Sequence, residues 1–203
     1  MASTGAMARR AAALGALLLA LLAAEPARAH PHVFVEVVPT LIFQKERVVG
    51  VVVEWTFDEL FSAMIIKDFD ADHNGKISPG ETAKLQAGAF DNLKQFGWFV
   101  HFHVGNANLP AKSVDGFGAQ IVKGRLVYTF TARPPSPANP REVSWNVLFY
   151  DETYYVDLRL EKSRPVRASG AEGSRCVPEV DSNPKLPDFA GMFVPEMIHV
   201  RCA

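Results

Sequence analysis

The chain has 203 residues, with 21 basic and 22 acidic side chains that leave a formal net charge of −1. This near balance excludes the strongly basic class of nucleic-acid-binding proteins, so no nucleic-acid partner is expected. The length corresponds to one domain that buries its own hydrophobic core without needing a metal ion or disulfides to fold.

The first residues predict a secretory signal peptide. Arg9 and Arg10 precede an apolar run that ends in a small-residue cleavage pattern, the Ala-Arg-Ala tripeptide at 27–29. The apolar run is shorter than a membrane-spanning helix requires. We therefore expect residues 1–29 to be removed and the mature chain to begin at His30, with a formal charge of about −3. The leader resembles bacterial ones, so the expected location is the periplasm, without insertion into the membrane.

Two strands and a helix are predicted to follow. Residues 32–43 and 48–55 are rich in β-branched side chains on either side of a polar turn, which indicates an opening hairpin. Thr56 and Glu59 then have the spacing of a helix capping box. Apolar residues recur at helical spacing over the same segment, namely Phe57, Leu60, Phe61, Met64, Ile65 and Phe69.

The segment from Asp70 to Glu81 reads DADHNGKISPGE and matches an EF-hand calcium loop. Calcium prefers about six to eight oxygen ligands, which such a loop supplies from its first, third, fifth, seventh, ninth and twelfth positions. Gly75 stands where the backbone of the loop turns sharply with positive φ. Three carboxylates predict a dissociation constant of about 10⁻⁵ to 10⁻³ M. The predicted calcium ligands are the side chains of Asp70, Asp72, Asn74, Ser78 and Glu81 and the backbone carbonyl of Lys76.

A second helix is predicted directly after the loop. Ser78 suits the N-cap and Pro79 suits the first helical position. One apolar face then continues through Leu85, Ala89, Leu93 and Phe96 until Gly97. The sequence therefore predicts a helix-loop-helix insertion at about 56–97. No second calcium loop is visible elsewhere in the sequence.

The remaining segments predict further strands, and the expected fold class is mainly β, or α+β. Asp151 and Glu152 are expected to form the turn of a hairpin. The whole mature chain, residues 30–203, is interpreted as one antiparallel β-sandwich with the EF-hand inserted between its second and third strands. The predicted later strands are 98–104, 118–122, 125–132, 142–150, 153–160 and 199–202.

Cys176 and Cys202 are the only cysteines of the chain. In an oxidising compartment an even pair of cysteines predicts a disulfide, and two free thiols are the alternative. The bridge is expected to hold an irregular tail at 165–195 against the body of the domain.

The histidines indicate a second possible chemistry. Cleavage before His30 leaves a free amine beside an imidazole, with His32 close by, and this combination suits a copper or nickel ion. His101 and His103 share one face of a predicted strand and would meet His32 if the first and third strands were neighbours. The alternative is that they are half-exposed strand histidines without a ligand.

Signatures of catalysis are scarce, and a non-enzymatic protein is expected. The sequence has no glycine-flanked nucleophile, no phosphate-binding loop and no dinucleotide fingerprint. Acidic pairs at 58–59 and 151–152 fit a helix amino terminus and a turn, where carboxylates are favoured on structural grounds. A hydrolase is therefore the least favoured interpretation.

Short blocks occur along nearly the whole mature chain: the hexapeptide at 30–35, Trp55 to Glu59, the acidic loop, Phe96 to Phe99, Tyr150 to Tyr155 and the tripeptide at 200–202. In these blocks the chain resembles the bacterial family called domain of unknown function 1007. The resemblance implies a periplasmic component of a transport system, encoded beside nickel- or cobalt-type metal transporters. It also places His30 and His32 on the opening motif of the family.

The sequence therefore predicts an exported calcium-binding protein that acts as an accessory of a metal-ion transport system, with a membrane metal transporter as its partner. The alternative is a periplasmic copper- or nickel-binding protein that uses His30 and His32. Calcium is expected to be structural, because millimolar external calcium keeps a site of this affinity largely filled.

Overall fold

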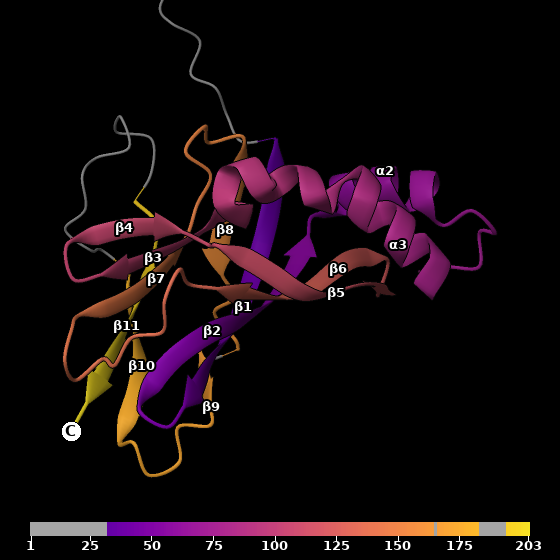
Figure 1. The fold of residues 1–203 in the computed structure, drawn as a ribbon. Coiled ribbons are helices and arrows are strands. Elements are labelled where there is room, and N and C mark those ends of the chain that lie inside the picture. The colour runs from indigo at the N-terminus through magenta and orange to yellow at the C-terminus, as the bar shows by residue number, and fades with distance from the viewer. Residues whose placement is uncertain (1–31, 165, 183–193) are drawn as a thin grey trace, which may run out of the picture. The chain divides into compact units, whose positions relative to one another are not determined.

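The computed structural model describes residues 32–164, 166–182 and 194–203. Over these residues the fold is mainly β, with two sheets and a helical segment between the second and third strands, as expected (Figure 1). The predicted signal peptide, 1–29, and His30 lie outside the described residues. Among the described helices, none combines the length and apolar character needed to cross a membrane.

The described elements are, in chain order, β1 (Val33–Gln44), β2 (Arg47–Phe57), α2 (Glu59–Phe69), α3 (Pro79–Gly88), the 3-10 segment η1 (Phe90–Phe99), β3 (Val100–Val104), β4 (Ala107–Pro110), β5 (Ser113–Val122), β6 (Arg125–Arg133), β7 (Trp145–Phe149), β8 (Val156–Leu160), β9 (Arg167–Ser169), β10 (Cys176–Asp181) and β11 (Met197–Cys202).

The first sheet has the strand order β5-β6-β2-β1-β8, and β9 also pairs with β1. Strands β1 and β2 form the predicted opening hairpin, which turns at Lys45 with φ of 57°. Buried residues recur at nearly every second position along β1 and β2, and every valine of the two strands is buried or half-buried, so one face of the hairpin is apolar. This hairpin is the centre of the sheet.

The second sheet has the order β10-β11-β7-β3-β4. Strand β3 begins at Val100, two residues later than predicted, because Gly97 and Trp98 adopt positive φ of 59° and 50°. A side chain at Gly97 would place its Cβ 2.6 Å from the Cβ of Pro110, so this position requires glycine. The short strands β4, β9 and β10 were not predicted.

The hairpin predicted around Asp151 and Glu152 is wrong. Strand β7 lies in the second sheet, whereas β8 lies in the first sheet and runs parallel to β1. The buried carboxylate of Asp151 accepts hydrogen bonds from the backbone N–H groups of Thr153, Tyr155 and Val156, which bends the chain from one sheet to the other. The pairing is consequently mixed, since β8 and β9 are both parallel to β1, and the expected wholly antiparallel arrangement needs this correction.

One hydrophobic core contains residues from both sheets and from the helical segment. Trp55 of β2 is 1% exposed and packs edge-on against Phe130 of β6, with ring centroids 4.8 Å apart. It also stacks on Phe99 and approaches Phe90 of η1. Aromatic packing therefore fixes η1 on the first sheet.

The entering helix, α2, begins two residues later than the predicted capping box. Thr56 pairs with Glu36 and Val127 inside the sheet, so Asp58 caps the helix instead and accepts a hydrogen bond from the N–H of Phe61. The buried Ser62 Oγ accepts from the N–H of Leu126 in β6 at 2.9 Å. This bond ties α2 to the first sheet.

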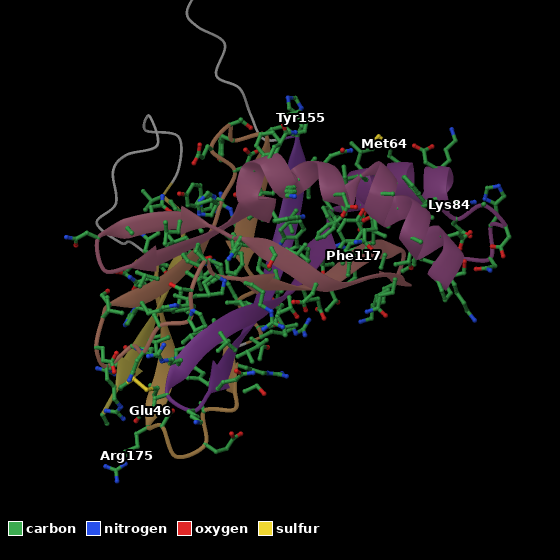
Figure 2. All side chains as sticks on the ribbon, viewed as in Figure 1. Glu46, Met64, Lys84, Phe117, Tyr155 and Arg175 are labelled. Atoms are coloured by element: carbon green, nitrogen blue, oxygen red, sulfur yellow. A yellow bond between two sulfur atoms is a disulfide. The ribbon has the colours of Figure 1, made fainter. Side chains whose placement is uncertain are left out.

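The exiting helix, α3, has the predicted start, with Ser78 and Glu81 forming a reciprocal capping box and Pro79 at the first position. It ends at Gly88 rather than Gly97, because Ala89 has non-helical φ and ψ of −130° and −57°. The chain continues as η1, where Phe90 stacks on Phe117 of β5 with centroids 4.2 Å apart. Figure 2 shows Phe117 below the helices, in the region of β5 and β6.

Cys176 and Cys202 form a disulfide between directly opposed positions of β10 and β11. The segment between them is therefore not wholly irregular, since β10 pairs with β11 along its full length. The bridge connects the edge strand of the second sheet to its neighbour.

The disulfide gives a prediction about stability. Cross-linking residues 26 apart reduces the entropy of the unfolded chain, so Cys202→Ser should lower the free energy of unfolding by about 3 to 4 kcal/mol. Urea denaturation of both proteins measures this difference. The intact mass of the wild type without reductant should be about two mass units below that of its reduced form. With reductant present, the wild type should lose its advantage over the variant. Alkylation of both thiols without reductant would contradict the bridge.

Candidate functional site

The acidic loop connects the end of α2 to the start of α3 and lies away from the two sheets (Figure 1). Asp70 is the C-cap of α2, and Glu81 lies in the first turn of α3. One carboxylate oxygen from each of Asp70, Asp72 and Glu81 lies within 4.8 Å of the others. Among the described residues, this is the only group of three or more His, Cys, Asp or Glu side chains with donor atoms so close together.

Asp70 organises the first half of the loop. Its side chain is buried, with the residue 3% exposed. One carboxylate oxygen accepts from the N–H of Asn74 at 3.1 Å, and the other accepts from the N–H of Gly75 at 2.9 Å. Gly75 has φ of 74° with open space where a Cβ would be, so glycine is favoured there by its backbone conformation and not by crowding.

Glu81 closes the loop from the other side. Its Oε1 accepts from the N–H of Ala71 at 2.8 Å, and its Oε2 accepts from the N–H and Oγ of Ser78, each at 2.8 Å. These bonds, led by the backbone N–H of Ser78, lower the pKa of Glu81 below its ordinary value. The carboxylate is therefore charged at neutral pH and lies across the loop.

The remaining predicted ligands are more exposed. Asp72 accepts hydrogen bonds from the backbone and side-chain amides of Asn74, and the side-chain Oδ1 of Asn74 accepts from the N–H of Lys76 at 2.8 Å. The six predicted residues thus lie on the segment from the end of α2 to the first turn of α3, and the carboxylates of three of them, Asp70, Asp72 and Glu81, come close together. Their donor atoms are oxygens, which suit a hard cation such as calcium or magnesium better than a soft metal.

Among the described residues, the histidines do not gather at one site. His32 is exposed, and its ring lies 5.0 Å from that of Tyr155. His101 and His103 belong to β3 of the second sheet, whereas His32 precedes β1 of the first sheet, so the first and third strands are not neighbours and the condition for a shared site is not met. A transition-metal site at His30 and His32 stays a prediction, because His30 lies outside the described residues.

His101 is also more buried than the half-exposed position expected for it. Its ring stacks on Tyr150 at 3.7 Å, and its Nε2–H donates to the backbone carbonyl of Tyr150 at 3.2 Å. Burial lowers the pKa of His101 to about 4. The imidazole is consequently neutral at physiological pH.

Sequence reasoning missed a cavity of about 330 Å³ next to this histidine, with both polar and apolar side chains in its lining. Its lining includes Lys94 of η1, Asn108 of β4 and Glu152 after β7, together with His101 and Tyr150. These residues come from separate segments that no local motif connects. The blocks Phe96 to Phe99 and Tyr150 to Tyr155 were the signals in the sequence that pointed toward this region, since both contribute to the lining.

Comparison with known proteins matches residues 15–189 to a family described as protein of unknown function DUF1007. An uncharacterised 15.5 kDa protein from the trpE 3′ region of Spirochaeta aurantia is 31% identical over 131 residues, which cover 64% of this chain and 93% of that protein. An uncharacterised protein of Haemophilus influenzae is 25% identical over 171 residues, which cover 81% of each chain. No solved structure matches the chain. The matched range includes the whole loop from Asp70 to Glu81.

The neutral, buried imidazole of His101 gives a prediction about pH. In the unfolded chain a histidine binds a proton near pH 6.5, whereas in the folded chain His101 binds one only near pH 4. The free energy of unfolding should therefore fall as the pH is lowered from about 6.5 to about 4, and the loss should reach about 3 kcal/mol at the lower pH. Urea denaturation at a series of pH values from about 7 to about 4 measures the loss.

The matched control is His101→Gln, whose amide can still donate to the carbonyl of Tyr150 but does not titrate. The lowered pKa of His103 acts in the same direction and is present in both proteins, so the difference between them isolates His101. Parallel stability curves for the wild type and the variant would show that His101 does not carry the effect.

Proposed function

The chain belongs to the family of proteins of unknown function DUF1007, and we propose that it binds a calcium ion in the loop from Asp70 to Glu81, as an EF-hand does. The observation that carries the proposal is the convergence of three carboxylates, from Asp70, Asp72 and Glu81, within 4.8 Å. Like charges are brought together at a cost in electrostatic energy that a divalent cation removes.

The hydrogen bonds of the loop support the same proposal. The carboxylate of Asp70, at the first position of the loop, accepts a hydrogen bond from the N–H of Gly75, at the sixth position. This bond holds the loop in a tight turn around the carboxylate. Glu81, at the twelfth position, reaches back to the N–H of Ala71 at the second. The two ends of the loop are thus already joined, so a cation needs little rearrangement of the backbone to bind between them.

The role proposed for calcium is structural. Helices α2 and α3 have few contacts with each other. One place where they come close is at Gly88 of α3, where an added Cβ would lie 3.5 Å from the ring of Phe69 in α2. A cation held by Asp70, at the end of α2, and by Glu81, at the start of α3, bridges the two helices directly. At about 1 mM external calcium, a site with a dissociation constant of about 10⁻⁵ to 10⁻³ M is between about half and almost fully occupied.

The place of action that we propose is the periplasm, where the protein is a non-enzymatic accessory of a metal-ion transport system in the membrane. The apolar leader and the disulfide between Cys176 and Cys202 support export to an oxidising compartment. The link to transport, and to a membrane transporter as partner, has its support in the sequence resemblance alone.

The calcium proposal predicts a selective loss on mutation of the closing ligand. Glu81→Gln removes a charge and one strong ligand oxygen, so calcium affinity should fall at least about tenfold by isothermal titration calorimetry. Calcium should also raise the thermal unfolding midpoint of the wild type, because it binds the folded state alone, and should raise that of the variant much less.

Asp68→Asn is a matched control, since Asp68 is an exposed carboxylate on α2 outside the cluster of three. This variant should bind calcium as the wild type does. If Glu81→Gln and Asp68→Asn titrate alike, or if the wild type releases no heat and gains no stability with calcium, the assignment of the loop is wrong.

A further inference from the structure

The cavity of about 330 Å³ beside His101 has side chains of both charges in its lining and shares no residue with the acidic loop. Lys94 and Gln95 of η1 contribute to the lining, and so does Glu152, which follows β7. Within the part of the chain that the structure describes, these three side chains form no hydrogen bond or ion pair. The cavity therefore offers two donor groups and one carboxylate that a ligand can use.

His101 adds a buried acceptor to the lining. The residue is 5% exposed, and its ring is held by the stack on Tyr150 and by the bond from its Nε2–H to the Tyr150 carbonyl. With the proton on Nε2, the neutral ring has a lone pair on Nδ1. This nitrogen has no hydrogen-bond partner among the described residues, and it is not one of their fully buried, unpaired atoms, so it remains accessible from the cavity. A ligand that donates a hydrogen bond can use Nδ1 without any movement of the ring.

The donors and the acceptors of the lining come from different elements. Both donors, Lys94 and Gln95, lie on η1, whereas His101 lies on β3 and Glu152 follows β7, the strand that pairs with β3. Phe96 and Phe99 also line the cavity, and their stacked rings, with centroids 5.8 Å apart, supply an apolar surface. A ligand that matches all three parts has a negative group, a positive group that donates hydrogen bonds, and an apolar body.

We propose that this cavity binds a free α-amino acid with an apolar side chain, its carboxylate toward Lys94 and Gln95 and its ammonium group toward Glu152 and His101. An α-amino acid combines both charges in a compact molecule. The cavity volume suits such a ligand, since it lies at the lower end of the range for small-molecule sites, about 300 to 1,000 Å³. A ligand with one charge leaves a charged side chain of the lining unpaired, so it gains less on binding. The inference does not depend on calcium binding by the loop.

L-leucine and two analogues that each lack one charged group test the proposal on the full mature chain with calcium in excess. Isopentylamine lacks the carboxylate, and isocaproate lacks the ammonium group. Isothermal titration calorimetry should give one site for leucine, with a dissociation constant on the order of 10 to 100 µM. Each analogue should bind at least about tenfold more weakly, because one end of the site stays unpaired. If leucine does not bind in a saturable manner, or if all three bind alike, the proposal fails.

Two variants at exposed positions test the orientation of the ligand. Lys94→Gln should weaken leucine binding about three- to tenfold but should not weaken isopentylamine, which has no carboxylate to pair. Glu152→Gln should weaken leucine by a similar factor but should not weaken isocaproate. The matched controls are Lys84→Gln on α3, labelled in Figure 2, and Glu59→Gln on α2, which lie outside the lining and should bind leucine as the wild type does. Equal leucine binding by the cavity variants and their controls would overturn the site.

Nitrogen NMR of the wild type tests the buried acceptor without a change to the core. In protein labelled at the histidine nitrogens, the Nδ1 signal of His101 should shift when leucine is added, because its lone pair accepts from the ammonium group. Isocaproate, which has no ammonium group, should leave this signal in place. The signal is assigned by its absence from the His101→Gln variant. If Nδ1 does not respond at saturating leucine, the role assigned to His101 is wrong.

Discussion

The aromatic packing around Trp55 is the interaction on which the rest of the structure depends. Trp55 lies on β2, at the centre of the first sheet, and its ring meets Phe130 of the neighbouring strand and both Phe90 and Phe99 of η1. Because each such ring buries a large apolar area, the cluster holds the helical segment against the sheet. The acidic loop joins α2 to α3, and α3 leads directly into η1.

Several aspartates accept hydrogen bonds from backbone N–H groups and so hold the backbone in place. Asp58 caps α2 and also accepts from the N–H of Phe34 at 2.9 Å, which joins the start of α2 to β1. Asp151 accepts backbone N–H groups where the chain passes between the sheets, and Asp70 does so inside the loop. The N–H donors satisfy the oxygens of these carboxylates, which offsets the cost of removing them wholly or partly from water.

Only the acidic loop among these carboxylate sites brings several negative charges together. Asp58 and Asp151 each use their oxygens to accept from nearby N–H groups, whereas Asp70, Asp72 and Glu81 also place oxygens close to one another. The closeness of the carboxylate oxygens to one another distinguishes the candidate ligands from carboxylates that only accept backbone hydrogen bonds. The sequence predicted structural roles for the acidic pairs at 58–59 and 151–152, and in the structure Asp58 caps α2 while Asp151 accepts N–H groups between β7 and β8.

The sequence by itself determined the features that depend on neighbouring residues. The opening hairpin, the capping box of Ser78 and Glu81, and the spacing of oxygen donors from Asp70 to Glu81 follow from local backbone preferences and short-range hydrogen bonds. Only the tertiary structure decided that β8 runs parallel to β1 in a different sheet from β7, and that His101 is buried against Tyr150, far from His32. These outcomes depend on which strands become neighbours, and that choice is made by burial of side chains distant in the sequence, such as Trp55 and Phe99, which no local pattern records.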